Sequence, residues 1–244
     1  MKKEKLIKNI NPLFLKGVAH RGLWNEQFTE NGIQAFKNAI DNGVAFEYDV
    51  HITKDNKVIV CHDSELERVT GKPGIIEDLT LKEIKDNYTL LDGTKIPTLE
   101  EVLKLNDEKV PMVIELKVYK DNFKELAKYT TGELGSIKDK KNVFLISFDP
   151  RALALTKKFG FMRGLLVCEA HDWTFKLRHM FESLDVEDTL LKRKEYQKYS
   201  KNHFVNVWTI EDKKVAEEVL PYVDTITFQK ISKDEIKSML ENKK

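Results

Sequence analysis

The chain reads Ala45-Phe46-Glu47-Tyr48-Asp49-Val50 within its first quarter. Side chains alternate along a β-strand, so Glu47 and Asp49 share one face while the intervening residues share the other. Two acids on the inward face of an otherwise apolar strand are costly to bury unless they are ion-paired, protonated or bound to a cation. Ion-paired carboxylates at a strand end are the simpler interpretation. The apolar residues of the alternate face favour burial, and with it a cation site.

A turn follows this strand. Thr53-Lys54-Asp55-Asn56-Lys57 predicts that residues 45–50 pair antiparallel with residues 58–62. A tight hairpin brings His62 opposite about Glu47. His20 ends the strand before this pair, at residues 17–20, so we expect both histidines near the two acids.

Short apolar runs alternate with amphipathic segments along the rest of the chain. Repeated β-then-α units predict a parallel sheet, and eight of them predict a closed α/β barrel. The predicted strands are residues 17–20, 45–50, 112–117, 143–147, 163–168, 183–187, 204–209 and 224–228. The clearest amphipathic segments between them are residues 32–42, 98–105, 150–159 and 212–220.

One segment breaks this rhythm. Residues 63–97 are too long for an ordinary loop, and their glycines and prolines mark turns. Thr80 and Glu83 have the spacing of a capping box, which predicts a short helix there. We therefore expect one barrel domain over residues 1–244 with an inserted cap at about 63–97.

The candidate catalytic groups follow from these strands. Each histidine alone is more often structural, but His20 and His62 at adjacent strand ends beside acids favour acid–base chemistry. Glu115 and Lys117 repeat the alternation on a later strand, where a simple salt bridge is the alternative interpretation. Three acidic oxygen ligands without a cysteine favour a hard cation, Ca²⁺ or Mg²⁺. Arg21 offers a planar fork for a phosphate oxygen and Lys117 a point charge.

Other candidates carry weaker signals. His51 follows Asp49 by two residues but is expected to begin the turn. Trp24 and Trp208 lie near strand ends and either line the mouth of the barrel or pack within it. Cys61 alternates away from His62, which argues against a nucleophilic thiol.

Composition narrows the class of protein. The 41 basic and 40 acidic residues leave a net charge of +1, so no global field favours nucleic acid or an anionic membrane. No apolar run approaches the ~20 residues of a membrane span, and the first residues lack the apolar stretch of a secretory signal. Two cysteines, Cys61 and Cys168, are too few for a disulfide scaffold. We therefore expect a cytoplasmic protein without stable membrane insertion.

In this order the motifs resemble those of the glycerophosphodiester phosphodiesterase family, densely to about residue 117 and thinly beyond. The motifs are His20-Arg21-Gly22, Glu30-Asn31, Glu47-Tyr48-Asp49-Val50, Thr53-Lys54-Asp55, His62-Asp63, residues 96–103, Glu115-Leu116-Lys117 and Val207-Trp208-Thr209. The resemblance implies a (β/α)8 TIM-type barrel with a small insertion after the second strand. It also implies metal-dependent hydrolysis of small glycerophosphodiesters to sn-glycerol 3-phosphate and an alcohol.

The resemblance also implies roles for single residues. His20 and His62 take the general acid and base roles, and Glu47, Asp49 and Glu115 hold one divalent cation. Arg21, Lys117 and Trp208 are implied to contact the substrate. Two departures stand out: Thr29-Glu30-Asn31-Gly32 replaces the usual Pro-Glu-Asn-Thr, and Thr227-Phe228-Gln229 replaces the usual Thr-Asp. The second change affects the wall that faces the substrate, and thus the alcohol that is accepted.

Two alternatives remain open. A lysophospholipase D- or sphingomyelinase D-like enzyme of the same barrel superfamily would need an apolar rim, for which Phe14, Trp24, Trp173 and Phe175 are candidates. A catalytically silent barrel that binds phosphodiesters is the other. Both histidines and all three acids argue against a silent barrel, because a binding protein has no need of paired acid–base groups.

Overall fold

Eight parallel strands close into a barrel in the computed structural model, which describes residues 3–243. Strand β1 pairs with both β2 and β9, which completes the ring. The predicted barrel is thus confirmed, and each of the eight expected strands lies within two residues of its predicted bounds. These eight are β1 (Val18–Ala19), β2 (Ala45–Ile52), β4 (Met112–Leu116), β5 (Val143–Ser147), β6 (Met162–Val167), β7 (Ser183–Glu187), β8 (Phe204–Ile210) and β9 (Thr225–Phe228). A ninth strand, β3 (Val58–Val60), pairs antiparallel with β2 outside the ring.

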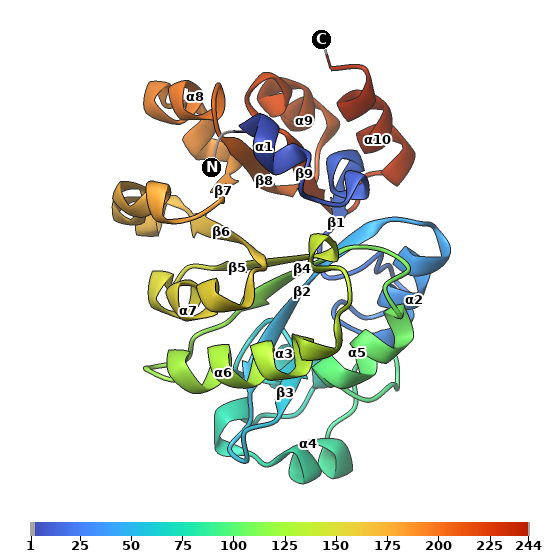
Figure 1. Cartoon of the computed structure of the whole chain (residues 1–244). Helices are drawn as coiled ribbons and strands as arrows, with labels where there is room; N and C mark the ends of the chain where they lie inside the picture. Colours follow the sequence, from blue (N-terminus) through green and yellow to red (C-terminus); the bar gives the residue numbers. More distant parts are fainter. Residues whose placement is uncertain (1–2, 244) are drawn as a thin grey trace.

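Helices surround the strands (Figure 1). The α-helices are α1 (Lys3–Ile7), α2 (Ile33–Asp41), α3 (Glu67–Thr70), α4 (Leu81–Asn87), α5 (Leu99–Asn106), α6 (Phe123–Glu133), α7 (Pro150–Thr156), α8 (Lys194–Ser200), α9 (Lys213–Val219) and α10 (Lys233–Glu241). Short 3-10 helices connect several of them: η1 (Pro12–Lys16), η2 (Ile76–Asp78), η3 (Leu134–Ser136), η4 (Lys140–Asn142), η5 (Lys157–Phe159), η6 (Glu169–Met180), η7 (Asp188–Lys192) and η8 (Leu220–Tyr222).

Strand β2 shows how alternation builds two separate cores. Its outward residues Phe46 and Tyr48 pack against Phe36 of α2, with the Phe36 and Phe46 rings stacked at 5.1 Å. Its inward residues include Glu47 and Asp49, which are buried inside the mouth of the barrel. The outer core therefore fixes the strand and leaves the inner face free to carry acids.

The hairpin after β2 is confirmed. Strand β3 pairs antiparallel with β2, with Val50 opposite Val60. This register, continued, puts His62 level with Tyr48, one residue from the predicted position. Strand β1 pairs only with Ala45 and Phe46, so the later residues of the same edge of β2 stay free for β3.

Residues 63–97, which we call the cap segment, carry α3, η2 and α4 between β3 and α5. Their apolar residues, which include Ile76 and Ile84, form a cluster with Ile59 of β3 that is separate from the main core. The predicted capping box is present: the Thr80 side chain accepts from the Glu83 N–H, and the Glu83 side chain accepts from the Thr80 N–H. Such a cap stabilises a helix by about 1 kcal/mol, which matters for a helix as short as α4.

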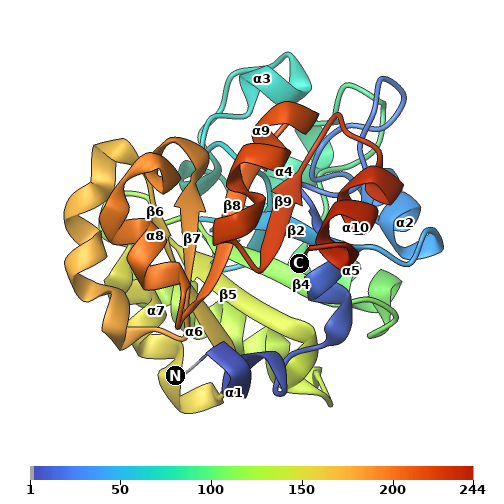
Figure 2. The same ribbon diagram turned by 90° about the horizontal axis from the view of Figure 1, so that it is seen from above.

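The two ends of the barrel differ. In Figure 2 the arrowheads of β7 and β9 point towards the end that carries α3, whereas α1 lies at the opposite end. From that opposite end, which we call the base, Leu6, Ile10 and Phe14 join the apolar side chains inside the barrel. The base is therefore filled, and the carboxyl ends of the strands form the open end.

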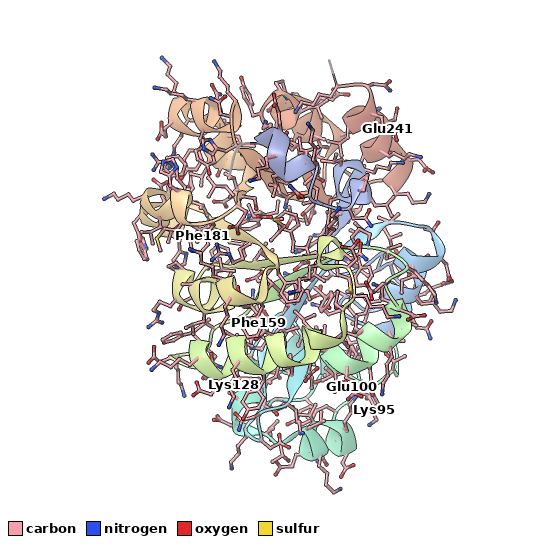
Figure 3. The ribbon with its side chains drawn as sticks, in the orientation of Figure 1. Lys95, Glu100, Lys128, Phe159, Phe181 and Glu241 are labelled. Atoms are coloured by element: carbon pink, nitrogen blue, oxygen red, sulfur yellow. The ribbon has the colours of Figure 1, made fainter. Side chains whose placement is uncertain are left out.

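Charged side chains cover the outer helices. Figure 3 shows Glu100 on α5 and Lys128 on α6 pointing outward, and both are exposed. Within residues 3–243, no helix has the length and apolar character that crossing a bilayer requires.

Candidate active site

Three carboxylates from two neighbouring strands meet at the open end of the barrel. Glu47 and Asp49 lie on β2, and Glu115 lies on β4 directly beside Asp49 in the parallel register. One oxygen from each lies within 4.8 Å of the others. The three residues are 3%, 1% and 8% exposed. The alternation of both strands thus gathers acids from distant parts of the chain.

Two cations border this cluster. Lys117 Nζ lies 3.1 Å from Glu115 Oε1 and 3.6 Å from Asp49 Oδ1. Arg21 Nε lies 3.6 Å from Asp49 Oδ2. The salt bridge between Glu115 and Lys117, the simpler interpretation of their spacing, is therefore present. Even with this salt bridge formed, the three acids lie close enough together to bind one ion.

The electrostatics of the cluster fit a bound cation. Burial, together with the negative charge of Asp49, raises the pKa of Glu47 well above its usual range. Burial also raises the pKa of Glu115 to about 7, although Lys117 opposes it. Burial by itself raises the pKa of Asp49, but Lys117 and other nearby cations outweigh it and lower that pKa. A divalent ion beside these carboxylates would favour their ionised forms and lower the first two pKa values.

Asp49 has one oxygen that suits a ligand. Its Oδ2 accepts a 2.9 Å hydrogen bond from Asn31 Nδ2, whereas its Oδ1 is buried without a hydrogen-bond partner among the described residues. Buried polar atoms are normally satisfied. The donor set is entirely carboxylate oxygen, which is the preference of Ca²⁺ and Mg²⁺.

His20 follows β1 and lies beside the acids. Its Nε2 is 4.0 Å from Glu47 Oε2, and its Nδ1 is 2.7 Å from Gln229 Oε1. Burial and the positive charge of Arg21 lower the pKa of His20 to about 4. The ring is therefore neutral near pH 7 and available to accept a proton.

His62 lies just beyond β3. Its Nδ1 is 2.6 Å from Asp63 Oδ1, and Arg68 of α3 contacts the other oxygen of Asp63. Burial lowers the pKa of His62, while Asp49 and Asp63 favour its charged form. The partner of His62 is thus an anion, whereas that of His20 is a neutral amide.

The turn after β1 adopts unusual backbone angles. Arg21 has φ 57° and Asn31 has φ 55°, both in the left-handed region that non-glycine residues rarely occupy. This geometry lets the Arg21 N–H donate to Glu47 Oε2 at 3.0 Å and its guanidinium reach Glu30 at 2.7 Å. Strained backbone of this kind is typical of functional sites.

A cleft of about 1120 Å³ opens beside these groups. Its lining includes His62, Glu115 and Lys117 together with Phe148, His171 and Trp173. The rings of Trp208 and Phe148 meet edge-on with their centres 5.5 Å apart. The buried Nε1 of Trp208 has no hydrogen-bond partner among the described residues.

Only one of the four aromatic residues considered for an apolar rim lines this cleft, and it is Trp173. Phe14 is buried at the base, and Phe175 packs against Tyr196 with ring centres 4.2 Å apart. Trp24 lines a smaller hollow formed by residues 24–30 with Arg68 and residues near Leu91. Of the four aromatic residues predicted for an apolar rim, only Trp173 can therefore contribute to one at this cleft.

Sequence reasoning gave too little weight to His51 and Gln229. His51 lies within β2 and is buried, rather than beginning the turn. His51 lies two residues after Asp49, and this spacing could have predicted that both side chains share one face of the strand. Gln229 contacts His20 across 209 positions of sequence, and no local pattern predicts such a pair.

Fold and site together define an α/β barrel with an acidic cluster and two histidines at the carboxyl ends of its strands. Residues 20–219 match the model of the glycerophosphoryl diester phosphodiesterase family, and the chain belongs to that family.

Relatives and solved structures agree with this membership. A glycerophosphodiester phosphodiesterase of Caldanaerobacter subterraneus is 40% identical over 108 residues, which span 41% of this chain and 44% of that relative. A lysophospholipase D of Mus musculus is 28% identical over 214 residues, spanning 78% of this chain and 67% of the relative. The crystal structure of a glycerophosphodiester phosphodiesterase from Parabacteroides distasonis superposes with a TM-score of 0.77 at 28% identity, covering 92% of this chain and 95% of that one. The match to the first relative takes in less than half of that protein's length.

Proposed function

We propose that this protein hydrolyses glycerophosphodiesters to sn-glycerol 3-phosphate and an alcohol. The observation that carries the proposal is the meeting of three buried carboxylates at the open end of the barrel, with His20 beside Glu47 and with His62 and Glu115 lining the cleft of a family member. The whole chain then acts as one barrel domain with the cap at about residues 63–97. The membership and the relatives' names support this substrate class.

Glu47, Asp49 and Glu115 would hold one divalent cation, Ca²⁺ or Mg²⁺, because their oxygens lie close enough together to share an ion. When bound, such a cation neutralises charge on the phosphate oxygens and makes the phosphorus easier to attack. Arg21 and Lys117 bring further positive charge to the same place, and both suit phosphate oxygens.

His20 is the proposed general base. Gln229 Oε1 accepts a hydrogen bond, so Nδ1 of His20 carries the hydrogen and Nε2 has the free lone pair. The neutral ring takes a proton from the attacking oxygen as that oxygen bonds to phosphorus.

His62 is the proposed general acid. Its Nδ1 faces the Asp63 carboxylate, which favours the protonated ring and opposes the burial that lowers the pKa of His62. As the bond from phosphorus to the alcohol oxygen breaks, His62 Nε2 gives its proton to that oxygen. Trp208, whose buried Nε1 has no hydrogen-bond partner among the described residues, would donate a hydrogen bond to a substrate oxygen.

Two attacking groups fit these roles. A glycerol hydroxyl would give a cyclic phosphate that water then opens, whereas direct attack by water would give the product in one step. Analysis of products early in the reaction separates the routes, because only the first releases or accumulates a cyclic phosphate.

Turnover of a panel of glycerophosphodiesters tests the function. We expect hydrolysis that a chelator abolishes and that Ca²⁺ or Mg²⁺ restores. Binding of the cation without hydrolysis of any diester would instead support a catalytically silent barrel. Hydrolysis that persists in the chelator would contradict the proposed role of the acids.

A second candidate is lysophospholipase D activity. Trp173 is 59% exposed and lines the cleft with Phe148, and this apolar wall would bind the acyl chain of a lysophospholipid. The relative of that name supports the comparison. Product analysis on glycerophosphocholine against lysophosphatidylcholine separates the two candidates. Trp173→Ala should raise KM for the lysophospholipid only, if that wall binds its chain.

A further inference from the structure

A buried pair of residues, His51 and Glu77, lies outside the acid–histidine set and has no role in the proposed reaction. His51 Nδ1 lies 2.7 Å from Glu77 Oε1, and the two side chains are 3% and 10% exposed. His51 belongs to β2 of the barrel, and Glu77 belongs to η2 of the cap segment. The pair therefore joins the cap segment to the barrel beside the cleft.

The second ring nitrogen of His51 leads to a candidate catalytic residue. His51 Nε2 lies 3.1 Å from the backbone carbonyl oxygen of His62. A carbonyl oxygen only accepts, so Nε2 carries the hydrogen. Glu77 and the His62 carbonyl thus contact the two ring nitrogens of His51, one on each side.

The backbone of His62 needs such a contact. Strand β3 ends at Val60, and the Cys61 N–H still donates to the Asp49 carbonyl at 3.1 Å. His62 lies just beyond this last bond to β2, so the sheet does not fix its carbonyl. Asp63 and Arg68 hold the imidazole end of the residue. His51 holds the backbone end.

We propose that His51, held by Glu77, is a positioning residue that fixes the backbone of His62 and so aims its ring at the substrate. This inference rests on the proposed function, in which His62 transfers a proton. A purely structural pair would only attach the cap segment to the barrel. The two roles differ in which hydrogen bond of His51 matters.

Two substitutions of His51 separate these roles. The amide N–H of Gln reaches about as far as Nε2 of histidine, so His51→Gln keeps a donor for the His62 carbonyl. The shorter Asn reaches about as far as Nδ1, so His51→Asn keeps the contact with Glu77 and loses the one with His62. We expect His51→Asn to lower kcat on glycerophosphocholine by about 10-fold to 100-fold with KM within about 2-fold, the usual effect of a misplaced catalytic group. His51→Gln should restore most of kcat.

A matched control is Lys85→Met, which removes a different contact between the cap segment and the barrel. Lys85 Nζ lies 2.7 Å from Glu101 of α5 and does not touch His51 or His62. We expect its kcat to equal that of the unmodified protein. If Lys85→Met loses as much kcat as His51→Asn, the loss comes from loosening the cap segment, and the positioning role is wrong.

Carbonyl NMR reports the same contact without catalysis. The sequence His-Asp occurs twice, at His62-Asp63 and His171-Asp172. Labelling histidine carbonyls with ¹³C and aspartate amides with ¹⁵N therefore gives two signals in a carbonyl–amide spectrum. His51→Asn should move the signal of the first pair and leave the second in place, and Glu77→Gln should move the first in the same sense. An unmoved first signal in both variants would overturn the inference.

The two levels of the proposal fail differently. If the unmodified protein cleaves no diester, the proposed function fails, while the carbonyl signal still tests the contact. If the protein is active and folded His51→Asn keeps full kcat, only the positioning role fails. Should His51→Asn not fold, Glu77→Gln replaces it, and a kcat equal to that of the unmodified protein overturns the role.

Discussion

Gln229 Oε1 lies 2.7 Å from Nδ1 of His20. The other end of this amide donates from Nε2 to the Glu211 carboxylate, which fixes the orientation of the Gln229 side chain. A neutral acceptor therefore selects the tautomer of His20 and adds no negative charge beside it. Gln229 stands in the Thr227-Phe228-Gln229 segment where the resemblance leads one to expect Thr-Asp.

Gln229→Glu should move the acid limb of the kcat/KM profile to higher pH. Burial holds the pKa of His20 at about 4, and a base works only while it is deprotonated. A carboxylate at Nδ1 favours the charged ring and raises that pKa, so activity should be lost at a higher pH as the solution is acidified. Initial rates between pH 4 and 9 measure the shift. An acid limb that stays where it was would contradict His20 as the base.

His20→Ala and His62→Ala should each lower kcat by about 10²-fold to 10⁴-fold, because each removes one proton-transfer group. The exposed His179 lies outside the cleft and gives a matched control, since His179→Ala should leave turnover unchanged. Steady-state rates at saturating substrate check all three. Near-normal turnover of the His20 or the His62 variant would refute that histidine's assignment.

Ca²⁺ or Mg²⁺ should raise the melting temperature through the acidic cluster. A ligand at 100 times its Kd stabilises a folded protein by about 2.7 kcal/mol, or about 5 to 10 °C for a chain of this size. Asp49→Asn should abolish most of this increment, because Asp49 lies within 4.8 Å of both other acids. Glu133 is a carboxylate of α6 outside the cluster, so Glu133→Gln should keep the rise in melting temperature on adding the cation. Melting curves of both variants, recorded with and without the cation, measure this difference.

Asp185→Asn should stabilise the protein at pH 8 but not at pH 4. Burial raises the pKa of Asp185 to about 7, although Asn206 hydrogen-bonds to it at 2.7 Å. A raised pKa contributes stability that is complete below the unfolded value of about 4 and is lost as the pH rises through about 7. The neutral amide avoids this loss, so its melting temperature at pH 8 should exceed that of the unmodified protein by at least about 2 °C. Equal melting temperatures across the pH range would show that Asp185 ionises freely.

The sequence was sufficient for the barrel because its strands are short apolar runs with clear breaks. Residues 143–147 and 183–187 have the same bounds in prediction and structure. Alternation also correctly placed Glu47 and Asp49 on one inward face. These are local properties, which a single sequence expresses directly.

Contacts between distant segments could not be predicted in the same way. The pairing of Gln229 with His20 depends on β9 lying beside β1 at closure of the barrel. The pairing of His51 with Glu77 depends on how the cap segment folds back onto β2. The sequence around Gln229 and the sequence around Glu77 contain no local pattern that distinguishes these residues from surface residues.

The filled base of the barrel has a consequence for how molecules reach the acids. Leu6, Ile10 and Phe14 pack with Phe144 and Phe204 inside the barrel, and the hollow between them holds only about 10 Å³. In the proposed reaction, the substrate and the glycerol phosphate product would therefore enter and leave by the same opening. Because both would occupy the same site, we expect glycerol phosphate to inhibit competitively.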